Sequence, residues 1–256
     1  MTDTPNEVVH TSIDKGICTI TLDAPHNRNA LSRQLVSEFG AALTAAIADD
    51  AIRAIVLTHT GGTFCAGADL SEASDDSNKA APVNLPDLLR SIVEAPKPVI
   101  GRIDGHVRAG GTGIVGACDI VLSSDKGTFG FSEALLGLTP AVISLTTIPR
   151  MTSRATNRYF LTGEVFDARV AEQIGLITRA ADDLDAELDA LTAQLRKASP
   201  QGLRESKKLQ SEQMLAGFDK NADRLTKLSM DLFATEEARE GMRSFLERRP
   251  ARWATE

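Results

Sequence analysis

The sequence predicts an α/β fold followed by an all-helical tail. Between about residues 50 and 180, short apolar runs typical of buried strands alternate with helical patterns. This alternation favours parallel strands joined by right-handed crossovers. After residue 183 only helical patterns remain. We therefore expect a core over residues 1–195 and a C-terminal helical region over residues 196–256.

The first elements are predicted by turn and cap signals. Two β-rich runs flank "DKG" at residues 14–16, which predicts a hairpin. Ser32 offers an N-cap for a helix, because apolar residues follow it at helical spacing. "RAIVLT" at residues 53–58 is an almost continuous apolar run and suits a buried strand. A glycine-rich turn follows, and a further helix is expected to begin near Asp69.

The middle of the chain continues the alternation. Residues 71–85 are polar and aperiodic, so we expect a surface loop there, and Pro86 is expected at the first position of the next helix. Strands are predicted at "KPVIGRI", "DIVLSS" and "TFGF", with a glycine-rich helical stretch between the first two. The tail carries four helical patterns, at residues 183–199, 200–215, 223–233 and 235–249.

Composition narrows the classes of function. The chain has 256 residues, 42% hydrophobic and 25% charged, which is ordinary for a globular protein. Its net charge of −7 disfavours a nucleic-acid partner, and no apolar run approaches the ~20 residues of a membrane span. Its three cysteines are far apart without metal-ligand spacing, which suggests reduced thiols and a cytoplasmic location.

The stretch "HVRAGGTGIVGACDI", residues 106–120, holds four glycines in a helical pattern. Each internal glycine costs a helix about 0.5–1 kcal/mol relative to alanine. Something must therefore approach this backbone closely. "CAGADL" at residues 65–70 has the same design, because it also lies between a buried strand and a helix.

Such junctions leave backbone N–H groups without partners inside the helix. If the amides of Ala68 and Gly110 point at one oxygen, they form an oxyanion hole, worth about 3–4 kcal/mol per donor. The alternative is that each is only a tight turn. Neither segment matches a dinucleotide-binding fingerprint or a phosphate loop.

The motifs "GGTFCAGADL", "KPVIGRIDGHVRAGGTGIVGACDIVLSS" and "GTFGFSEALLGLTPAVISLTTIPRM" resemble the crotonase, or enoyl-CoA hydratase/isomerase, superfamily. The resemblance extends from "NRNAL" to "SFLERRPARW" and covers nearly the whole chain. It implies a crotonase-like ββα spiral core with a C-terminal helical trimerisation region. It also implies an acyl-CoA substrate, no metal, no cofactor beyond the CoA moiety, and a homotrimer or a hexamer built as a dimer of trimers.

The resemblance implies roles for individual residues. The amides of Ala68 and Gly110 would hold the thioester oxygen while negative charge grows on it. Arg28 and Ala30 match one CoA-binding loop, and Phe245 and Arg249 match positions that reach the CoA of a neighbouring subunit. The remaining expected substrate contacts are Ala66, Gly67, Asp69, Leu70 and Gly111.

Typical hydratases of this family use two glutamates. Glu133 matches one of them, whereas the position of the other is Gly113. Without the resemblance, Glu133 reads as an ordinary glutamate at a helix start. In an apolar acyl pocket its pKa would be raised, which suits proton transfer near neutral pH.

Other polar residues near the glycines have simpler expected roles. We expect structural roles for His106 and Asp119, and a helix cap at Asp69. Arg108 is unusual beside Gly110. It has three possible partners: CoA, a substrate carboxylate or a local aspartate.

The function expected from the resemblance is hydration of a 2-enoyl-CoA, as in fatty-acid β-oxidation, with Glu133 as the single acid/base. Because one carboxylate suffices to move a proton between two carbons, an enoyl-CoA isomerase is the first alternative. The second is an acyl-CoA-binding homologue without catalysis.

Overall fold

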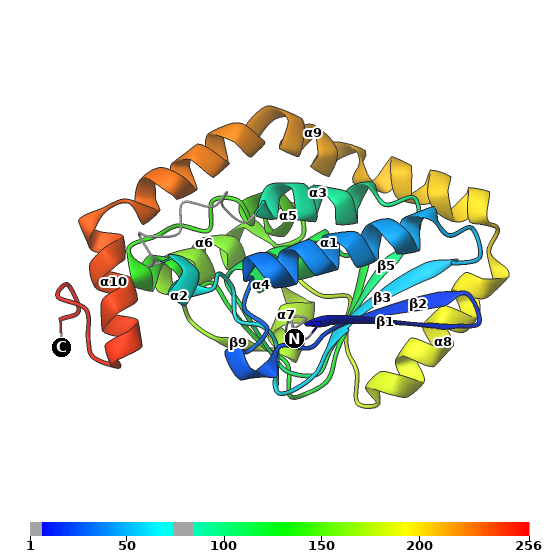
Figure 1. The fold of residues 1–256 in the computed structure, drawn as a ribbon, viewed down its shortest axis with the longest axis horizontal. Helices are drawn as coiled ribbons and strands as arrows, with labels where there is room; N and C mark the ends of the chain where they lie inside the picture. The colour runs from blue at the N-terminus through cyan, green and yellow to red at the C-terminus, as the bar shows by residue number, and fades with distance from the viewer. Residues whose placement is uncertain (1–6, 74–83, 256) are drawn as a thin grey trace, which may run out of the picture.

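The computed structural model describes residues 7–73 and 84–255 and is built around two sheets (Figure 1). The larger sheet has six strands in the order β1-β2-β3-β5-β7-β10. Only β1 and β2 pair antiparallel, and the other pairs are parallel. The α/β fold and the parallel sheet expected from the sequence are thereby confirmed.

The expected hairpin and first helix are both present. Strands β1 (Val9–Asp14) and β2 (Ile17–Leu22) are joined by Lys15 and Gly16, which both have positive φ. Such a two-residue turn matches the twist of a hairpin. Helix α1 (Arg33–Ala48) begins after Ser32, whose side chain accepts a hydrogen bond from the Leu35 amide at 3.2 Å.

The chain then passes three times from the large sheet to a small one. Strands β3 (Ala54–His59), β5 (Val99–Ile103) and β7 (Ile120–Ser123) belong to the large sheet. Each leads directly into a strand of the small sheet: β4 (Thr63–Cys65), β6 (His106–Arg108) or β8 (Thr128–Gly130). A helix follows each pair, so the repeated unit is strand–strand–helix, as the family resemblance implies.

Several short helices and turns follow these strand pairs. They are α2 (Leu70–Ala73), α3 (Leu85–Glu94), α4 (Gly110–Ala117), the 3₁₀ turn η2 (Glu133–Leu136), α5 (Ser144–Thr147) and α6 (Ser153–Thr162). A short 3₁₀ turn, η1 (Pro25–Asn27), precedes α1. Three further elements complete the body: β9 (Phe166–Asp167), α7 (Ala168–Gln173) and β10 (Arg179–Ala180).

The surface loop expected over residues 71–85 is partly corrected. Residues 71–73 belong to α2, and Leu85 begins α3 after Asn84, whose side chain accepts a hydrogen bond from the Asp87 amide at 3.3 Å. Pro86 therefore lies in the first turn of α3 but is not its first residue. Residues 74–83 lie outside the described part of the chain.

The helical tail begins with α8 (Leu184–Lys197), continues with α9 (Pro200–Phe233) and ends with α10 (Glu236–Glu247). The two helices expected over 200–215 and 223–233 form one continuous helix of 34 residues, which runs through Gly217. Figure 1 shows α9 passing over α3 and α5, with α10 standing at one end of the molecule. A division at residue 195 would fall in the last turn of α8, and a separate unit over 196–256 stays a prediction.

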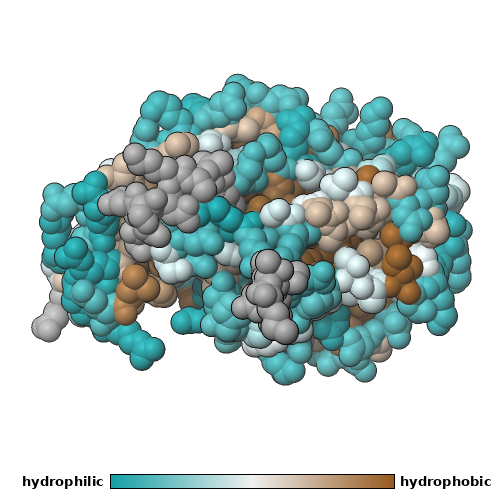
Figure 2. Space-filling model, in the orientation of Figure 1, coloured by the Kyte–Doolittle hydropathy of each residue, from teal (hydrophilic) through white to brown (hydrophobic). Residues whose placement is uncertain are grey.

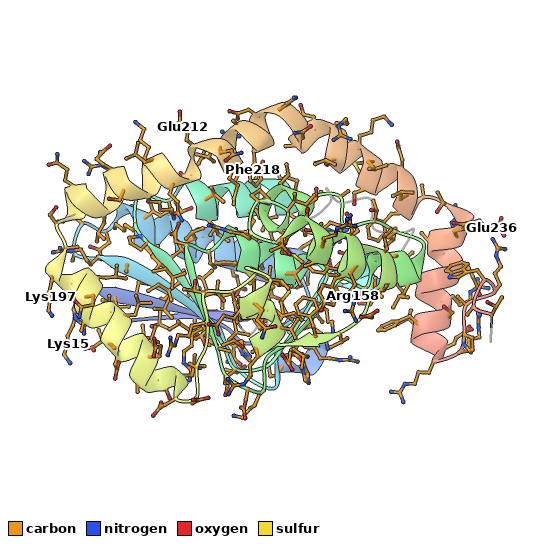
Figure 3. All side chains as sticks on the ribbon, turned by 180° about the vertical axis from the view of Figure 1, so that it is seen from behind. Lys15, Arg158, Lys197, Glu212, Phe218 and Glu236 are labelled. Carbon is orange, nitrogen blue, oxygen red and sulfur yellow. The ribbon has the colours of Figure 1, made fainter. Side chains whose placement is uncertain are left out.

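The main core lies between the large sheet and the helices that cover it. Phe218 points from α9 into this core and is 1% exposed, whereas Glu212 on the same helix points outward (Figure 3). A second cluster, on the other face of the sheet, packs Val56 and Ile100 against Leu188 and Leu191 of α8. The view in Figure 2 shows a largely hydrophilic surface with apolar residues in patches. Within residues 7–73 and 84–255, no helix is long and apolar enough to cross a bilayer.

Candidate active site

The residues expected to act on the substrate follow three neighbouring parallel strands. Strands β4, β6 and β8 pair in parallel, with Cys65 opposite Val107 and Arg108 opposite Gly130. Their carboxyl ends therefore lie at one edge of the small sheet, where ligands commonly bind in parallel sheets. Ala68, Gly110 and Glu133 lie within three residues of these ends.

The first two of these turns are in contact. A Cβ atom added to Gly67, which has φ +91°, would lie 2.8 Å from the Ala109 Cβ and 3.3 Å from the Gly110 amide nitrogen. Gly67 is thus required both by its backbone conformation and by the closeness of the second turn. The Leu31 amide donates to the Gly67 carbonyl at 2.8 Å and holds this turn in place.

The amides of Ala68 and Gly110 are available to a ligand. Within the described part of the chain, neither amide donates a hydrogen bond to a protein acceptor. Gly110 is buried and Ala68 is exposed, so the pair lies at the boundary between protein and solvent. An unpaired buried N–H is rare and costly, and a bound oxygen would satisfy it.

Ala109 turns the chain sharply from β6 into α4. Its φ of 45° and ψ of −117° are unfavourable for a residue with a side chain. Three hydrogen bonds hold it: its amide donates to Gly130, and its carbonyl accepts from the amide and the hydroxyl of Thr112. Such backbone strain clusters at functional sites, where surrounding contacts maintain it.

Packing explains all four glycines in α4. A Cβ on Gly111 would lie 2.8 Å from Cys65, and one on Gly116 would lie 2.8 Å from the Thr146 carbonyl oxygen. A Cβ on Gly113 would lie 2.6 Å from the Ile143 Cγ2. A Cβ on Gly110 would lie 2.6 Å from the Leu31 Cδ1 and 3.6 Å from the Gly67 Cα of the neighbouring turn.

Glu133 has the properties of a proton carrier. It begins η2 and is 9% exposed, and its Oε2 is buried without a hydrogen-bond partner. Burial raises the pKa of Glu133 to about 7, and a hydrogen bond from its own amide offsets only part of that effect. The raised pKa expected from the sequence is therefore present, and the group is about half ionised near neutral pH.

The loop before α1 supports the first turn. The Arg28 carbonyl accepts a hydrogen bond from the Ala66 amide at 3.1 Å, so the two expected CoA-binding segments lie side by side. Arg28 has an exposed side chain and a left-handed backbone, whereas Ala30 is buried. Asp69 accepts from the amide and the hydroxyl of Ser71, as a helix cap does.

Phe245 and Arg249 lie in the tail. Phe245 on α10 is 56% exposed, and Arg249 is held by two hydrogen bonds to Glu240 and one to Glu247. The two hydrogen bonds that Arg249 donates to Glu240 lower the pKa of Glu240 to about 2. Helix α10 packs closely on η2, so a Cβ on Gly241 would overlap the Leu136 carbonyl oxygen. Contact of Phe245 and Arg249 with a neighbouring subunit's CoA stays a prediction.

His106, Arg108 and Asp119 make contacts within the protein. His106 lies 2.8 Å from the Thr128 hydroxyl, and Arg108 donates to the carbonyls of Val107 and Thr128 and to that hydroxyl. No aspartate or glutamate of residues 7–73 and 84–255 pairs with Arg108, and burial lowers its pKa. Asp119 accepts from the buried Lys207 at 2.8 Å, as its expected structural role requires.

Two surface hollows lie elsewhere in the described part of the chain. The described residues contain no group of three or more histidines, cysteines or acidic residues arranged to hold a metal ion. One surface hollow lies beside α7 and is lined by Asp125, Asp167 and Asp182, together with Arg169 and three alanines. Another, between α3 and α9, is lined by Asp87, Asp223 and Asp231 among others. Such acidic linings do not suit an acyl chain or a phosphate.

A family model for enoyl-CoA hydratase/isomerase matches residues 12–256. The chain belongs to the enoyl-CoA hydratase/isomerase family. Its fold is therefore that of the crotonase superfamily, as the sequence motifs predict.

Solved and curated relatives of this family match the chain over nearly its whole length. The crystal structure of an enoyl-CoA hydratase from Mycobacterium avium is 47% identical, with a TM-score of 0.89, and the match covers 97% of this chain and 100% of that one. A 2,3-dehydroadipyl-CoA hydratase from Escherichia coli is 29% identical, with 91% and 93% covered. A mevalonyl-coenzyme A hydratase from Aspergillus fumigatus is 30% identical, with 93% and 91% covered.

Two residues of this family member were not singled out from the sequence. Asn29 is fully buried; its amide donates to the carbonyls of Thr60 and Thr63, and its oxygen accepts from Ala24. It ties the loop before α1 to strand β4 of the small sheet. The sequence signal that could have pointed to Asn29 was its place in "NRNAL", where the family resemblance begins. Ile143 lies against Gly113, and only its spatial position reveals this contact.

Proposed function

We propose that the chain catalyses reversible addition of water to a 2-enoyl-CoA through a stabilised enolate. The observation that carries the proposal is Glu133, a buried carboxyl whose Oε2 has no hydrogen-bond partner and whose pKa is raised to about 7. It follows the strand next to the one that leads into Gly110. A carboxyl of this kind both accepts and returns a proton near neutral pH.

The chemistry needs one carboxyl and two amides. The Glu133 carboxylate takes a proton from water as the water oxygen bonds to C3 of the enoyl group. The C2–C3 π electrons move to the thioester oxygen, where the Ala68 and Gly110 amides stabilise the negative charge. The Glu133 carboxylic acid then returns the proton to C2, and the carbonyl re-forms. In the reverse direction the same groups eliminate water.

The relatives support hydration as the reaction. Those named above are hydratases of CoA thioesters by name. Their acyl groups are not assigned to this chain. The thioester end, which is common to all of them, is the part that Ala68 and Gly110 would hold.

Isomerisation of a 3-enoyl-CoA to a 2-enoyl-CoA is the second candidate. It is favoured by Gly113, whose Cβ position is occupied by the apolar Ile143 and Leu89 rather than by a polar group that would hold water. One carboxyl can remove a proton from C2 and deliver it to C4. The same amides would hold the intermediate enolate.

Purified protein with crotonyl-CoA distinguishes these functions. We expect loss of the conjugated enoyl absorbance, and a decrease in kcat/KM of about 10²–10⁴-fold in Glu133→Gln. Glu212→Gln, the same change on an exposed position of α9, should leave the rate unchanged.

Other results would contradict hydration. No reaction with crotonyl-CoA, together with conversion of a 3-enoyl-CoA, would establish the isomerase. Binding of acyl-CoA without turnover of either substrate, unaltered in Glu133→Gln, would leave a non-catalytic binder.

We also propose that the protein acts as a homotrimer or hexamer without a cofactor beyond the CoA of its substrate. The support is the family resemblance, which assigns contacts to the tail. A monomer by light scattering at micromolar concentration would contradict this. A cytoplasmic location stays a prediction.

A further inference from the structure

The two proposed donor amides belong to peptide groups whose carbonyls accept hydrogen bonds. In a trans peptide the carbonyl and the N–H point in opposite directions, so a partner that holds the carbonyl also directs the N–H. No described peptide bond is cis. The Gly67 carbonyl, in the peptide group of the Ala68 amide, accepts from the Leu31 amide at 2.8 Å. The direction of the Ala68 N–H is therefore set by the backbone of the loop before α1.

The second donor amide is directed by a side chain as well. The Ala109 carbonyl, in the peptide group of the Gly110 amide, accepts from the Thr112 amide at 2.8 Å and from the Thr112 hydroxyl at 2.6 Å. Thr112 is fully buried, so water does not compete for this hydroxyl. Within the described part of the chain, a side-chain hydrogen bond reaches the peptide group of Gly110 but not that of Ala68.

The backbone at Ala109 needs to be held. Its φ of 45° and ψ of −117° lie in a sparsely populated region, which costs about 1–3 kcal/mol. The Ala109 amide donates to the Gly130 carbonyl at 3.0 Å, which fixes the peptide group before Ala109. The peptide group after Ala109 carries the Gly110 N–H and could relieve the strain by turning about ψ. The two hydrogen bonds from Thr112 oppose this rotation.

The same kind of hydrogen bond occurs elsewhere in the chain without such a consequence. Threonine hydroxyls in helices commonly bond a carbonyl three or four residues back. Thr192 on α8 is buried, and its hydroxyl donates to the Asp189 carbonyl at 3.1 Å. That carbonyl lies inside a helix on the other face of the large sheet. The Thr112 bond differs because it ends on a strained residue whose peptide group carries a proposed donor.

Resting on the proposed function, we propose that Thr112 is a positioning residue whose hydroxyl fixes the direction of the Gly110 N–H toward the thioester oxygen. Thr112 acts through the Ala109 carbonyl and does not itself touch the substrate. Loss of the hydroxyl leaves the bond from the Thr112 amide but allows the peptide group to tilt. The alternative role of Thr112 is packing alone, which would not alter the polarisation of a bound thioester.

The test is the carbonyl stretching frequency of bound butyryl-CoA, labelled with carbon-13 at the thioester carbon and measured by infrared difference spectroscopy. Hydrogen bonds to the carbonyl oxygen lower this frequency, so the measurement reports the donors without turnover. We expect binding to the wild type to lower the frequency. Thr112→Val should reverse a large part of this shift, whereas Thr112→Ser, which keeps the hydroxyl, should preserve it.

Hydration of crotonyl-CoA provides a second readout. Thr112→Val should lower kcat by roughly 10–10²-fold, because a misplacement of about 1 Å can cost 10²-fold and a lost donor costs about 10²–10³-fold. KM should change by less than about threefold, since the lost interaction is made mainly in the transition state. Thr112→Ser should restore most of the rate. Thr112→Ala replaces the valine variant if that variant does not fold.

A matched control and the outcomes make the result specific. Thr192→Val removes a similar bond and should change neither the frequency nor kcat. If the wild type does not bind butyryl-CoA, or binds it without lowering the frequency, both the proposed function and the inference are wrong. If the frequency is lowered but crotonyl-CoA is not hydrated, hydration alone is wrong, and the frequencies of the Thr112 variants still decide the inference. A wild-type frequency in Thr112→Val, or loss of the shift in Thr112→Ser, would overturn the inference alone.

Discussion

The two ends of helix α4 differ in how completely their polar groups are satisfied. At the N-terminal end the Gly110 amide has no protein partner, Ala109 is strained, and Glu133, in the turn after the neighbouring strand β8, has an unpaired buried oxygen. At the C-terminal end Arg150 donates to the carbonyls of Gly116 and Cys118. The contrast indicates that one end anchors the helix and leaves the other free to bind a ligand.

A buried ion pair strengthens the anchored end. Asp119, directly after Cys118, accepts from Lys207 of α9 at 2.8 Å and from the Val99 amide at 2.7 Å. Lys207 also donates to the carbonyls of Ile92 and Lys97. One side chain thus joins the tail, α3 and the large sheet behind the site.

The largest effect is expected from breaking this anchor. Lys207→Met leaves Asp119 buried without its cation and should lower the free energy of unfolding by about 3–5 kcal/mol. Urea denaturation measures the change. The exposed pair of Arg90 with Asp219 is the matched control, and Arg90→Met should cost less than about 1 kcal/mol. Equal losses in the two variants would show that burial of the Lys207–Asp119 pair does not make it a stronger anchor than an exposed pair.

The next largest effect on stability is expected from Glu133, near the N-terminal end of α4. Burial raises the pKa of Glu133 to about 7 from 4.5, so the folded state holds this proton more tightly than the unfolded state. The contribution of protonated Glu133 to the free energy of unfolding is fully present below about pH 4.5 and is lost as the pH rises through 7. Glu133→Gln should therefore stabilise the protein by about 3 kcal/mol at pH 8.

The pH dependence provides the check on that prediction. Thermal unfolding at pH 8 and at pH 4.5 should show a large stabilisation by Glu133→Gln at the higher pH and little at the lower. A gain that is the same at both values would show that ionisation of Glu133 is not its cause.

The smallest effect is expected at the strained turn. Ala109→Gly relieves a backbone with φ of 45° and should stabilise the fold by at most about 1 kcal/mol. Ala45→Gly, on the exposed side of α1, should destabilise it by a similar amount. Chemical denaturation of both variants checks the opposite signs. Destabilisation by Ala109→Gly would mean that this turn is not strained.

Much of the local structure was predictable because its signals are local. Ser32 caps α1 as expected, the hairpin turns at Lys15 and Gly16, and the glycine-rich segment 106–120 contains α4. The small sheet was not expected as a separate sheet. Its strands have two or three residues, too few to show a period of two.

The sequence by itself determined the family, the identity of the candidate site residues and the order of most helices and strands. These properties depend on motifs and periodic patterns that neighbouring residues carry. Only the tertiary structure decided that Ile143 packs against Gly113, that Lys207 reaches Asp119, and that the Glu133 Oε2 is buried without a hydrogen-bond partner. Each of these depends on contacts between segments distant in the chain, which packing selects and local sequence does not encode.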